Sequence, residues 1–227
     1  MPNKPTKKDR REASKQARFE AKRLATKQRR RRFFYGGLGA AAFIALIVGI
    51  VLFGGKAVKV DTAALNRAAV AAGCTSLQSP PNLGGTHVAQ GTTVQYDSDP
   101  PTSGSHYLVP GIAPGPTGVH TTPIQNEIQV HNLEHGHVGI QYADPLQASI
   151  RDSMESFTRS HDTTVFMAPR QFTGSPGTVV AFTSWGKLIS CSSPTNASAV
   201  EALAKLFYGD FQGLSPEIIP GTPLQGG

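Results

Sequence analysis

The sequence predicts an α+β fold, with helices packed on a single mixed β-sheet and one transmembrane helix before it. Strand-like and helix-like segments follow one another in the order β-α-β-β-α over residues 127–208, which is typical of that class. An uncharged apolar run at residues 33–54 separates this part from a basic N-terminus. We therefore divide the 227-residue chain into a tail, a membrane span and a folded domain.

Residues 1–32 form the predicted cytoplasmic tail and carry most of the positive charge. They hold fourteen Lys/Arg and three Asp/Glu, a net charge of +11, whereas residues 33–227 hold eight and twelve, a net charge of −4. The overall charge of +7 therefore reports membrane topology, and we expect no nucleic-acid partner. We expect the tail to bind anionic membrane lipids, with each basic residue contributing about 1 kcal/mol.

Residues 33–54 form the predicted transmembrane helix. A helix needs about 20 apolar residues to cross the hydrocarbon core, and this run is long enough. Four arginines at residues 29–32 precede it, so the positive-inside rule places the N-terminus in the cytoplasm and the domain outside. The alternative is a cleaved signal peptide, whose apolar region and basic region are shorter. We favour a single-pass anchor in the cell membrane; both alternatives place the domain outside the cytoplasm.

Residues 55–72 are predicted to form a stalk with a short helix, and residues 73–227 the extracytoplasmic domain. Asp61 is the expected N-cap of the short helix, and Gly73 follows its end. Cys74 and Cys191 are the two cysteines of the chain, and an oxidising compartment favours a disulfide between them. Two buried free thiols are the alternative. We expect the last few residues to be disordered.

The regular elements of the domain are predicted from residue 127 onward. Apolar residues alternate at period two up to Tyr142, and a helix is expected to begin at Asp144–Pro145 and run to about Ser160. Two strands rich in β-branched residues are expected at 163–170 and 178–191, and Asn196 should cap a last helix through Tyr208.

Residues 79–126 are rich in proline and glycine and predict turns and extended pieces. Long irregular segments in a compact domain are usually functional or disordered. We favour an ordered segment, because His87, Tyr96, His106 and Tyr107 lie along it and would need burial or a ligand.

Five of the seven histidines lie between His106 and His137, and three of them occur within seven residues beside Glu134. Histidine is the commonest metal ligand, and a carboxylate can bind a metal or act as a base. The spacing H-x-x-E-H at residues 131–135 is also that of inverted zincin proteases, where it lies on a helix. We doubt that helix, because Gly136 and a strand pattern follow at once.

Both backbone conformations place His131 and His135 on a common side, so a metal site is compatible with either. We predict that His106, His131, His135 and Glu134 bind one transition metal ion, with zinc or copper suited to imidazole ligands. His137 is a further candidate. The competing interpretation is a structural hydrogen-bond network.

In that structural network, Glu134 would pair with Arg170 or with a protonated histidine. A third interpretation is a metal-dependent hydrolase, although no other catalytic motif supports an enzyme and no catalytic residue is assigned.

Four segments resemble the bacterial domain of unknown function 3105. They are DPPTSGSHY at 99–107, VHNLEHGHVGIQY at 130–142, APR at 168–170 and TSWGKLISC at 183–191. The resemblance covers about residues 70–220 and implies a bacterial extracytoplasmic domain, but no assigned activity. The motif positions that match are Pro100, Pro101, Ser103, Gly104, His106, His131, Glu134, His135 and Gly136.

The leading interpretation is thus a membrane-anchored extracytoplasmic domain that binds a transition metal, and the sequence favours a non-enzymatic role without deciding it. A non-enzymatic interaction module of the cell envelope is the first alternative, and a metal-dependent hydrolase is the second. The sequence identifies no protein partner.

Overall fold

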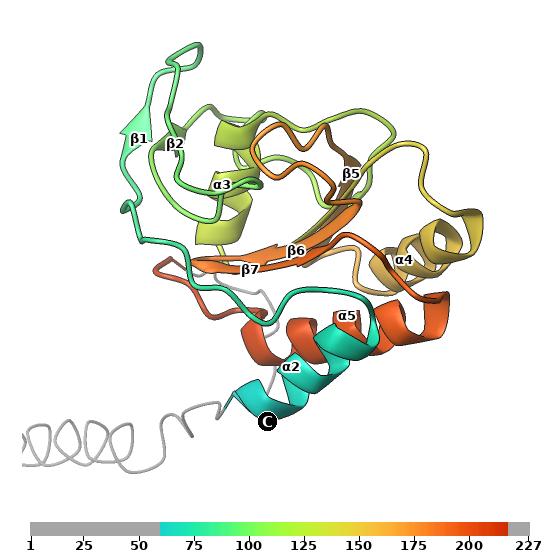
Figure 1. Ribbon diagram of the computed structural model, residues 1–227. Helices are drawn as coiled ribbons and strands as arrows, with labels where there is room; N and C mark the ends of the chain where they lie inside the picture. Colours follow the sequence, from blue (N-terminus) through green and yellow to red (C-terminus); the bar gives the residue numbers. More distant parts are fainter. Residues whose placement is uncertain (1–59, 218–227) are drawn as a thin grey trace, which may run out of the picture. The chain divides into compact units, whose positions relative to one another are not determined.

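The computed structural model describes residues 60–217 (Figure 1). The predicted tail and transmembrane helix, and the terminal residues expected to be disordered, lie outside the described residues. Among residues 60–217, no helix is both long enough and apolar enough to cross a membrane.

A five-stranded mixed sheet forms the centre of the described domain. Its strands are β3 (Gly118–Val119), β4 (Val138–Tyr142), β5 (Val165–Pro169), β6 (Val180–Ser184) and β7 (Lys187–Cys191). Their order is β3-β5-β4-β6-β7. The strands β3, β5 and β4 run parallel to one another, β6 is antiparallel to β4, and β7 is antiparallel to β6. The predicted mixed α+β class is therefore confirmed for the described residues.

The region predicted as one strand, residues 178–191, is instead the hairpin of β6 and β7. Trp185 and Gly186 form its turn, and Ser184 is paired with Lys187. Gly186 has a φ of +64°, a conformation that a tight hairpin turn demands and that glycine adopts without strain. The predicted element order was wrong here. A two-residue turn divides the β-branched run, so the one predicted strand is two.

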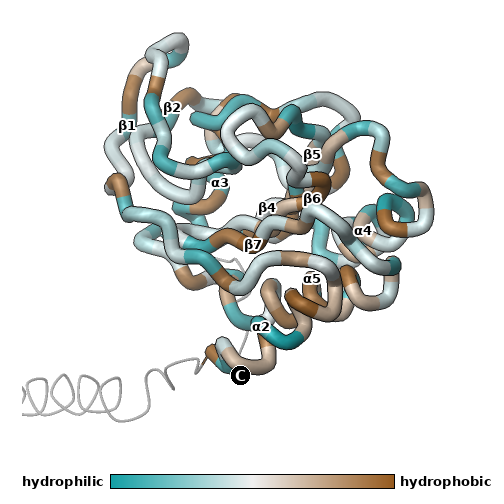
Figure 2. The backbone as a smooth tube through the Cα atoms, viewed as in Figure 1, coloured by the Kyte–Doolittle hydropathy of each residue, from teal (hydrophilic) through white to brown (hydrophobic). Residues whose placement is uncertain are grey.

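Three helices cover one face of the sheet: α2 (Thr62–Ala71), α4 (Ala148–Ser160) and α5 (Ala197–Phe211). Val138, Ile140 and Tyr142 of β4 point into this apolar layer, as their alternation predicted. Leu65 of α2 and Phe207 of α5 are fully buried there. Figure 2 shows hydrophobic residues gathered along the strands and the facing helices.

The helix starts follow the predicted caps at two of three positions. Asp61 accepts a hydrogen bond from Ala64 N at 3.0 Å, and Asn196 accepts one from Ala199 N at 2.9 Å. The predicted start at Asp144–Pro145 was wrong, because α4 begins at Ala148. The Asp144 carboxylate instead lies 3.6 Å from the guanidinium of Arg151.

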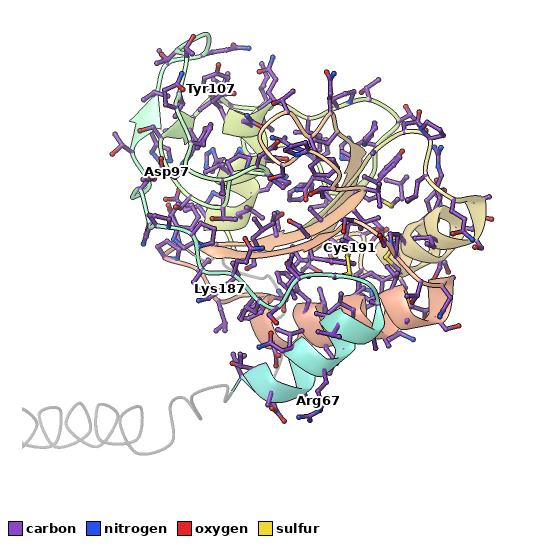
Figure 3. The ribbon with its side chains drawn as sticks, viewed as in Figure 1. Arg67, Asp97, Tyr107, Lys187 and Cys191 are labelled. Atoms are coloured by element: carbon purple, nitrogen blue, oxygen red, sulfur yellow. A yellow bond between two sulfur atoms is a disulfide. The ribbon has the colours of Figure 1, made fainter. Side chains whose placement is uncertain are left out.

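Cys74 and Cys191 are joined at disulfide distance, with their Sγ atoms 2.01 Å apart (Figure 3). The contact connects the segment after α2 to the end of β7. Thr75 N and Gln78 N donate to Ser190 O and Leu188 O at 2.8 Å, so this segment also covers the outer edge of β7.

The opposite face of the sheet lies under α3 (Asn126–Glu134) and mixes buried polar residues with apolar ones such as Phe166. Gln141 donates to Thr183 Oγ1 at 3.0 Å within this buried face. A Cβ at Gly139 would lie 2.5 Å from the Phe166 ring, so only glycine fits there. The helix α3 also packs against β2 (His106–Tyr107), which pairs with β1 (His87–Val88) in a separate two-stranded sheet.

Candidate metal centre

The short strands β1 and β2 bring together two histidines that are 19 positions apart in sequence. The strands pair in parallel, with His87 opposite His106 and Val88 opposite Tyr107. Equivalent positions on paired strands point their side chains to the same face. The two imidazole rings therefore meet edge to face, with their centroids 4.8 Å apart.

Helix α3 supplies the other two side chains of the site. His131 and Glu134 are three residues apart on this helix, a spacing that places side chains on one face. The expected absence of a helix was wrong, because Gly136 adopts a φ of +83° and so lets the chain leave the helix within two residues of Glu134. The spacing H-x-x-E-H therefore does lie largely on a helix.

The four side chains converge on one point. One ligand-type atom from each of His87, His106, His131 and Glu134 lies within 4.8 Å of all the others. The ring centroids of His106 and His131 are 4.7 Å apart, and those of His87 and His131 are 5.1 Å apart. Three imidazoles and a carboxylate form a donor set of the kind that suits zinc, copper and nickel.

The backbone orients the two buried imidazoles. His106 Nδ1 lies 2.8 Å from Gly104 O, and His131 Nδ1 lies 2.5 Å from Tyr107 O. A carbonyl can only accept, so Nδ1 carries a hydrogen in each ring, and Nε2 is left as the nitrogen that can bind a metal. Histidines that bind metals are usually oriented in this way, by a hydrogen bond from the second ring nitrogen.

The carboxylate of Glu134 is buried beside these rings. Its Oε2 atom lies 2.8 Å from His106 Nε2 and 3.6 Å from His87 Nε2. Within residues 60–217, its ion-pair partners are these imidazoles alone, without a lysine or arginine. Despite the short distance, neither His106 Nε2 nor Glu134 Oε2 makes a hydrogen bond. Both atoms face the shared space between the four side chains.

A neighbouring glycine lets the chain close over this carboxylate. A Cβ added at Gly85 would lie 1.9 Å from Glu134 Oε1 and 3.5 Å from the Trp185 ring. The backbone before His87 therefore packs directly on the Glu134 carboxylate. The ring of Trp185, in the turn between β6 and β7, lies 6.5 Å from that of His106, beside the candidate centre.

Burial favours the metal-binding protonation state of His131. Desolvation lowers the pKa of His131 to about 4, although its hydrogen bond to Tyr107 O acts in the opposite direction. The neighbouring imidazoles lower this pKa further. His131 is therefore neutral at pH 7, as a metal ligand must be.

His135 lies next to the centre, and neither it nor His137 belongs to the group of four. The ring of His135 stacks on that of His131, with centroids 4.8 Å apart and planes 25° apart. The Nδ1 atoms of both residues are buried without a hydrogen-bond partner. Burial lowers the pKa of His137 to about 4.

Arg170 lies away from Glu134 and binds the loop that leads to His106. Its Nε donates to Asp99 at 2.7 Å, its Nη2 also contacts that carboxylate, and its Nη1 donates to Asn126 at 2.8 Å. Asp99 begins the loop that carries His106, and Asn126 begins α3. Arg170 therefore joins the two segments that carry the buried ligands, and pairing with Glu134 does not occur.

Of the residues predicted to bind a metal, His106, His131 and Glu134 meet at the centre. His135 does not belong to the group of four, and its ring stacks on that of His131. His87 was missing from the predicted ligands. One signal pointed to it: His87 is a histidine in an irregular segment where it needs burial or a ligand. Its pairing with His106 depends on a parallel contact between two-residue strands, for which the sequence has no periodic pattern.

Neither a protein of curated function nor a solved structure matches the chain. The family model described as "Protein of unknown function (DUF3105)" matches residues 87–217, which is more than half of the chain. The match begins at His87 and includes all four residues of the centre. The chain therefore belongs to the DUF3105 family of proteins of unknown function.

Proposed function

We propose that this domain binds one divalent transition metal ion through His87, His106, His131 and Glu134. The observation that carries the proposal is the convergence of three imidazoles and one carboxylate, with one ligand-type atom of each within 4.8 Å of all the others. Within residues 60–217 the buried carboxylate has no lysine or arginine partner, so a cation held among these four groups would compensate its charge. A bound metal ion would supply that charge.

The distances in the cluster support an ion of ordinary size. Two ligand atoms at about 2.0–2.1 Å from a tetrahedral zinc ion lie about 3.3 Å apart. The contacts of Glu134 Oε2 with His106 and His87, at 2.8 and 3.6 Å, bracket this value. Small movements of the side chains would complete the coordination, with zinc or copper as the proposed ion.

A structural network of histidines explains the centre less well. In such a network the buried nitrogens would be paired with each other or with backbone carbonyls. The Nδ1 atoms of His106 and His131 meet this expectation, but His106 Nε2 and Glu134 Oε2 do not. A hydrolase would need a free general base, whereas Glu134 lies among the ligand atoms.

The membrane-anchored, extracytoplasmic location is also part of the proposal. The net charge of +11 before the apolar run supports a cytoplasmic N-terminus. The cysteine pair at bonding distance fits an oxidising compartment. A topology reporter fused after Gly227 should face away from the cytoplasm, and a reporter active in the cytoplasm would contradict the location.

Metal content tests the metal proposal. The full-length protein, purified in detergent without a histidine tag, should hold one zinc or copper ion per chain by elemental mass spectrometry. The variants His106→Ala and His131→Ala should each lose the ion, because each removes a buried ligand.

The matched control is His120→Ala. It removes an imidazole that contacts Pro116 O and stands outside the group of four. Equal metal content in all three variants and the wild type would contradict the proposal. A metal-free wild type that loses its fold when His131 is replaced would instead indicate structural histidines.

A further inference from the structure

The four residues of the candidate centre differ in how they are held. His106 and Glu134 have side chains that are 0% and 7% exposed, and His131 is 1% exposed as a residue. The side chain of His87 is 37% exposed. The centre is therefore closed by protein on the side of the first three residues and open to solvent at His87.

The imidazole rings also differ in the hydrogen bonds that orient them. Backbone carbonyls accept hydrogen bonds from the Nδ1 atoms of His106 and His131. The ring of His87 makes no hydrogen bond within residues 60–217, and its polar contact there is Glu134 Oε2 at 3.6 Å. A side chain without such support rotates at little cost, whereas the two oriented rings must break a hydrogen bond to turn.

The element that carries His87 is also weakly attached. Strand β1 has two residues, pairs with β2 alone, and belongs to an irregular segment. His106 lies in the strand that packs against α3. Local opening requires few broken contacts in a segment of this kind.

We propose that His87 is the exchangeable ligand of the centre, through which the metal ion enters and leaves on the solvent side. The inference rests on the proposed function and deepens it, because the ion is then cargo exchanged with chelating molecules in solution. During exchange, the bond between the ion and His87 Nε2 breaks and a bond to a water or an incoming ligand forms. The ion keeps its oxidation state, and His106, His131 and Glu134 hold it until the incoming ligand takes it over.

Release kinetics test this role. The full-length protein, loaded with Co²⁺ or Zn²⁺, is mixed with excess EDTA, and loss of the ion is followed by absorbance or by a zinc indicator. Changes to residues that only support a ligand cost about 10–100-fold in affinity, so loss of His87 itself should reach that range. We expect His87→Ala to bind one ion and to release it at least about tenfold faster than the wild type. His106→Ala should fail to load.

Chemical modification gives a second measurement that does not depend on release. Diethylpyrocarbonate reacts with exposed imidazoles, and mass spectrometry locates the modified residue. In the metal-free protein His87 should react well before His106 and His131, and added Zn²⁺ should protect it.

The outcomes separate this inference from the proposed function. If the wild type and His87→Ala bind the ion and release it at equal rates, the role of His87 is overturned and metal binding stands. If the wild type keeps its ion for as long as it stays folded, the site is closed and the inference is likewise overturned. If the wild type binds none of Co²⁺, Zn²⁺ and Cu²⁺, both proposals fall.

Discussion

The two faces of the central sheet differ in character, although the same strands build both. One face buries Val138, Ile140 and Phe182 under three helices. The other face carries Gln141 and Thr183 beneath α3. This helix holds His131 and Glu134 of the candidate centre. We call the first the apolar layer and the second the histidine layer.

The difference between the layers follows from the free energy of burial. Burying apolar surface stabilises the fold by about 25 cal/mol per Å². Burying polar groups costs free energy unless they find partners, and the histidine layer retains unpaired atoms such as His135 Nδ1 and His137 Nδ1. The apolar layer therefore supplies stability, whereas the histidine layer keeps buried polar groups at a cost in stability, as functional sites often do.

Lowering the pH should produce the largest change in the free energy of unfolding, through the buried histidines of the histidine layer. Burial lowers the pKa values of His131 and His137 to about 4 in the folded protein, against 6.5 in the unfolded chain. Between pH 6.5 and 4 the unfolded chain binds protons that the folded protein does not, so the free energy of unfolding falls as pH falls. The loss should approach about 3 kcal/mol per imidazole by pH 4, measured by chemical denaturation of the metal-free protein.

A variant separates the two imidazoles. His137→Gln removes one titrating group, so the slope of unfolding free energy against pH should decrease by up to about 1.4 kcal/mol per pH unit between pH 4 and 6.5. An unchanged slope would show that His137 does not titrate in this window.

Truncation in the apolar layer should lower stability without changing the metal site. Leu203 on α5 is fully buried, and Leu203→Ala should lower the free energy of unfolding by about 2–5 kcal/mol. Guanidinium denaturation measures the loss, and metal titration of the folded protein should give an unchanged affinity.

The matched control lies on the same helix. Leu206 is 39% exposed, and Leu206→Ala should change the free energy of unfolding by no more than about 0.5 kcal/mol. Equal losses for the two variants would mean that α5 does not bury the face described.

A methyl group at Gly85 should have the smallest effect on stability while still changing metal binding. The added Cβ would lie 1.9 Å from Glu134 Oε1, so the carboxylate must move. We expect Gly85→Ala to weaken metal binding by about 10–100-fold, as changes beside a ligand do, with a smaller change in the denaturation midpoint. Titration with Zn²⁺ against a competing chelator measures the affinity.

Replacing the exposed neighbour Thr86 with alanine is the control for this segment. Thr86→Ala should bind the ion as the wild type does. If Gly85→Ala also keeps the wild-type affinity, Glu134 does not bind the metal through the position described.

Local sequence patterns predicted the apolar layer well, because each of its features depends on neighbours in the chain. The alternation of Val138, Ile140 and Tyr142, and the caps at Asp61 and Asn196, are properties of short segments. The residue types in such a segment are sufficient to predict a helix or strand and the face that it buries. The same holds for Glu134 and the histidines around it, whose density made them candidates.

The composition of the histidine layer was decided by the tertiary structure alone. His87 joins the centre through a parallel pairing with His106, His135 falls behind it where α3 ends, and Arg170 binds Asp99 instead of Glu134. Each outcome depends on contacts between segments distant in sequence, or on where a helix stops. Local periodicity carries no information about such contacts, so the sequence alone determined which residue types were available, and folding decided which of them meet.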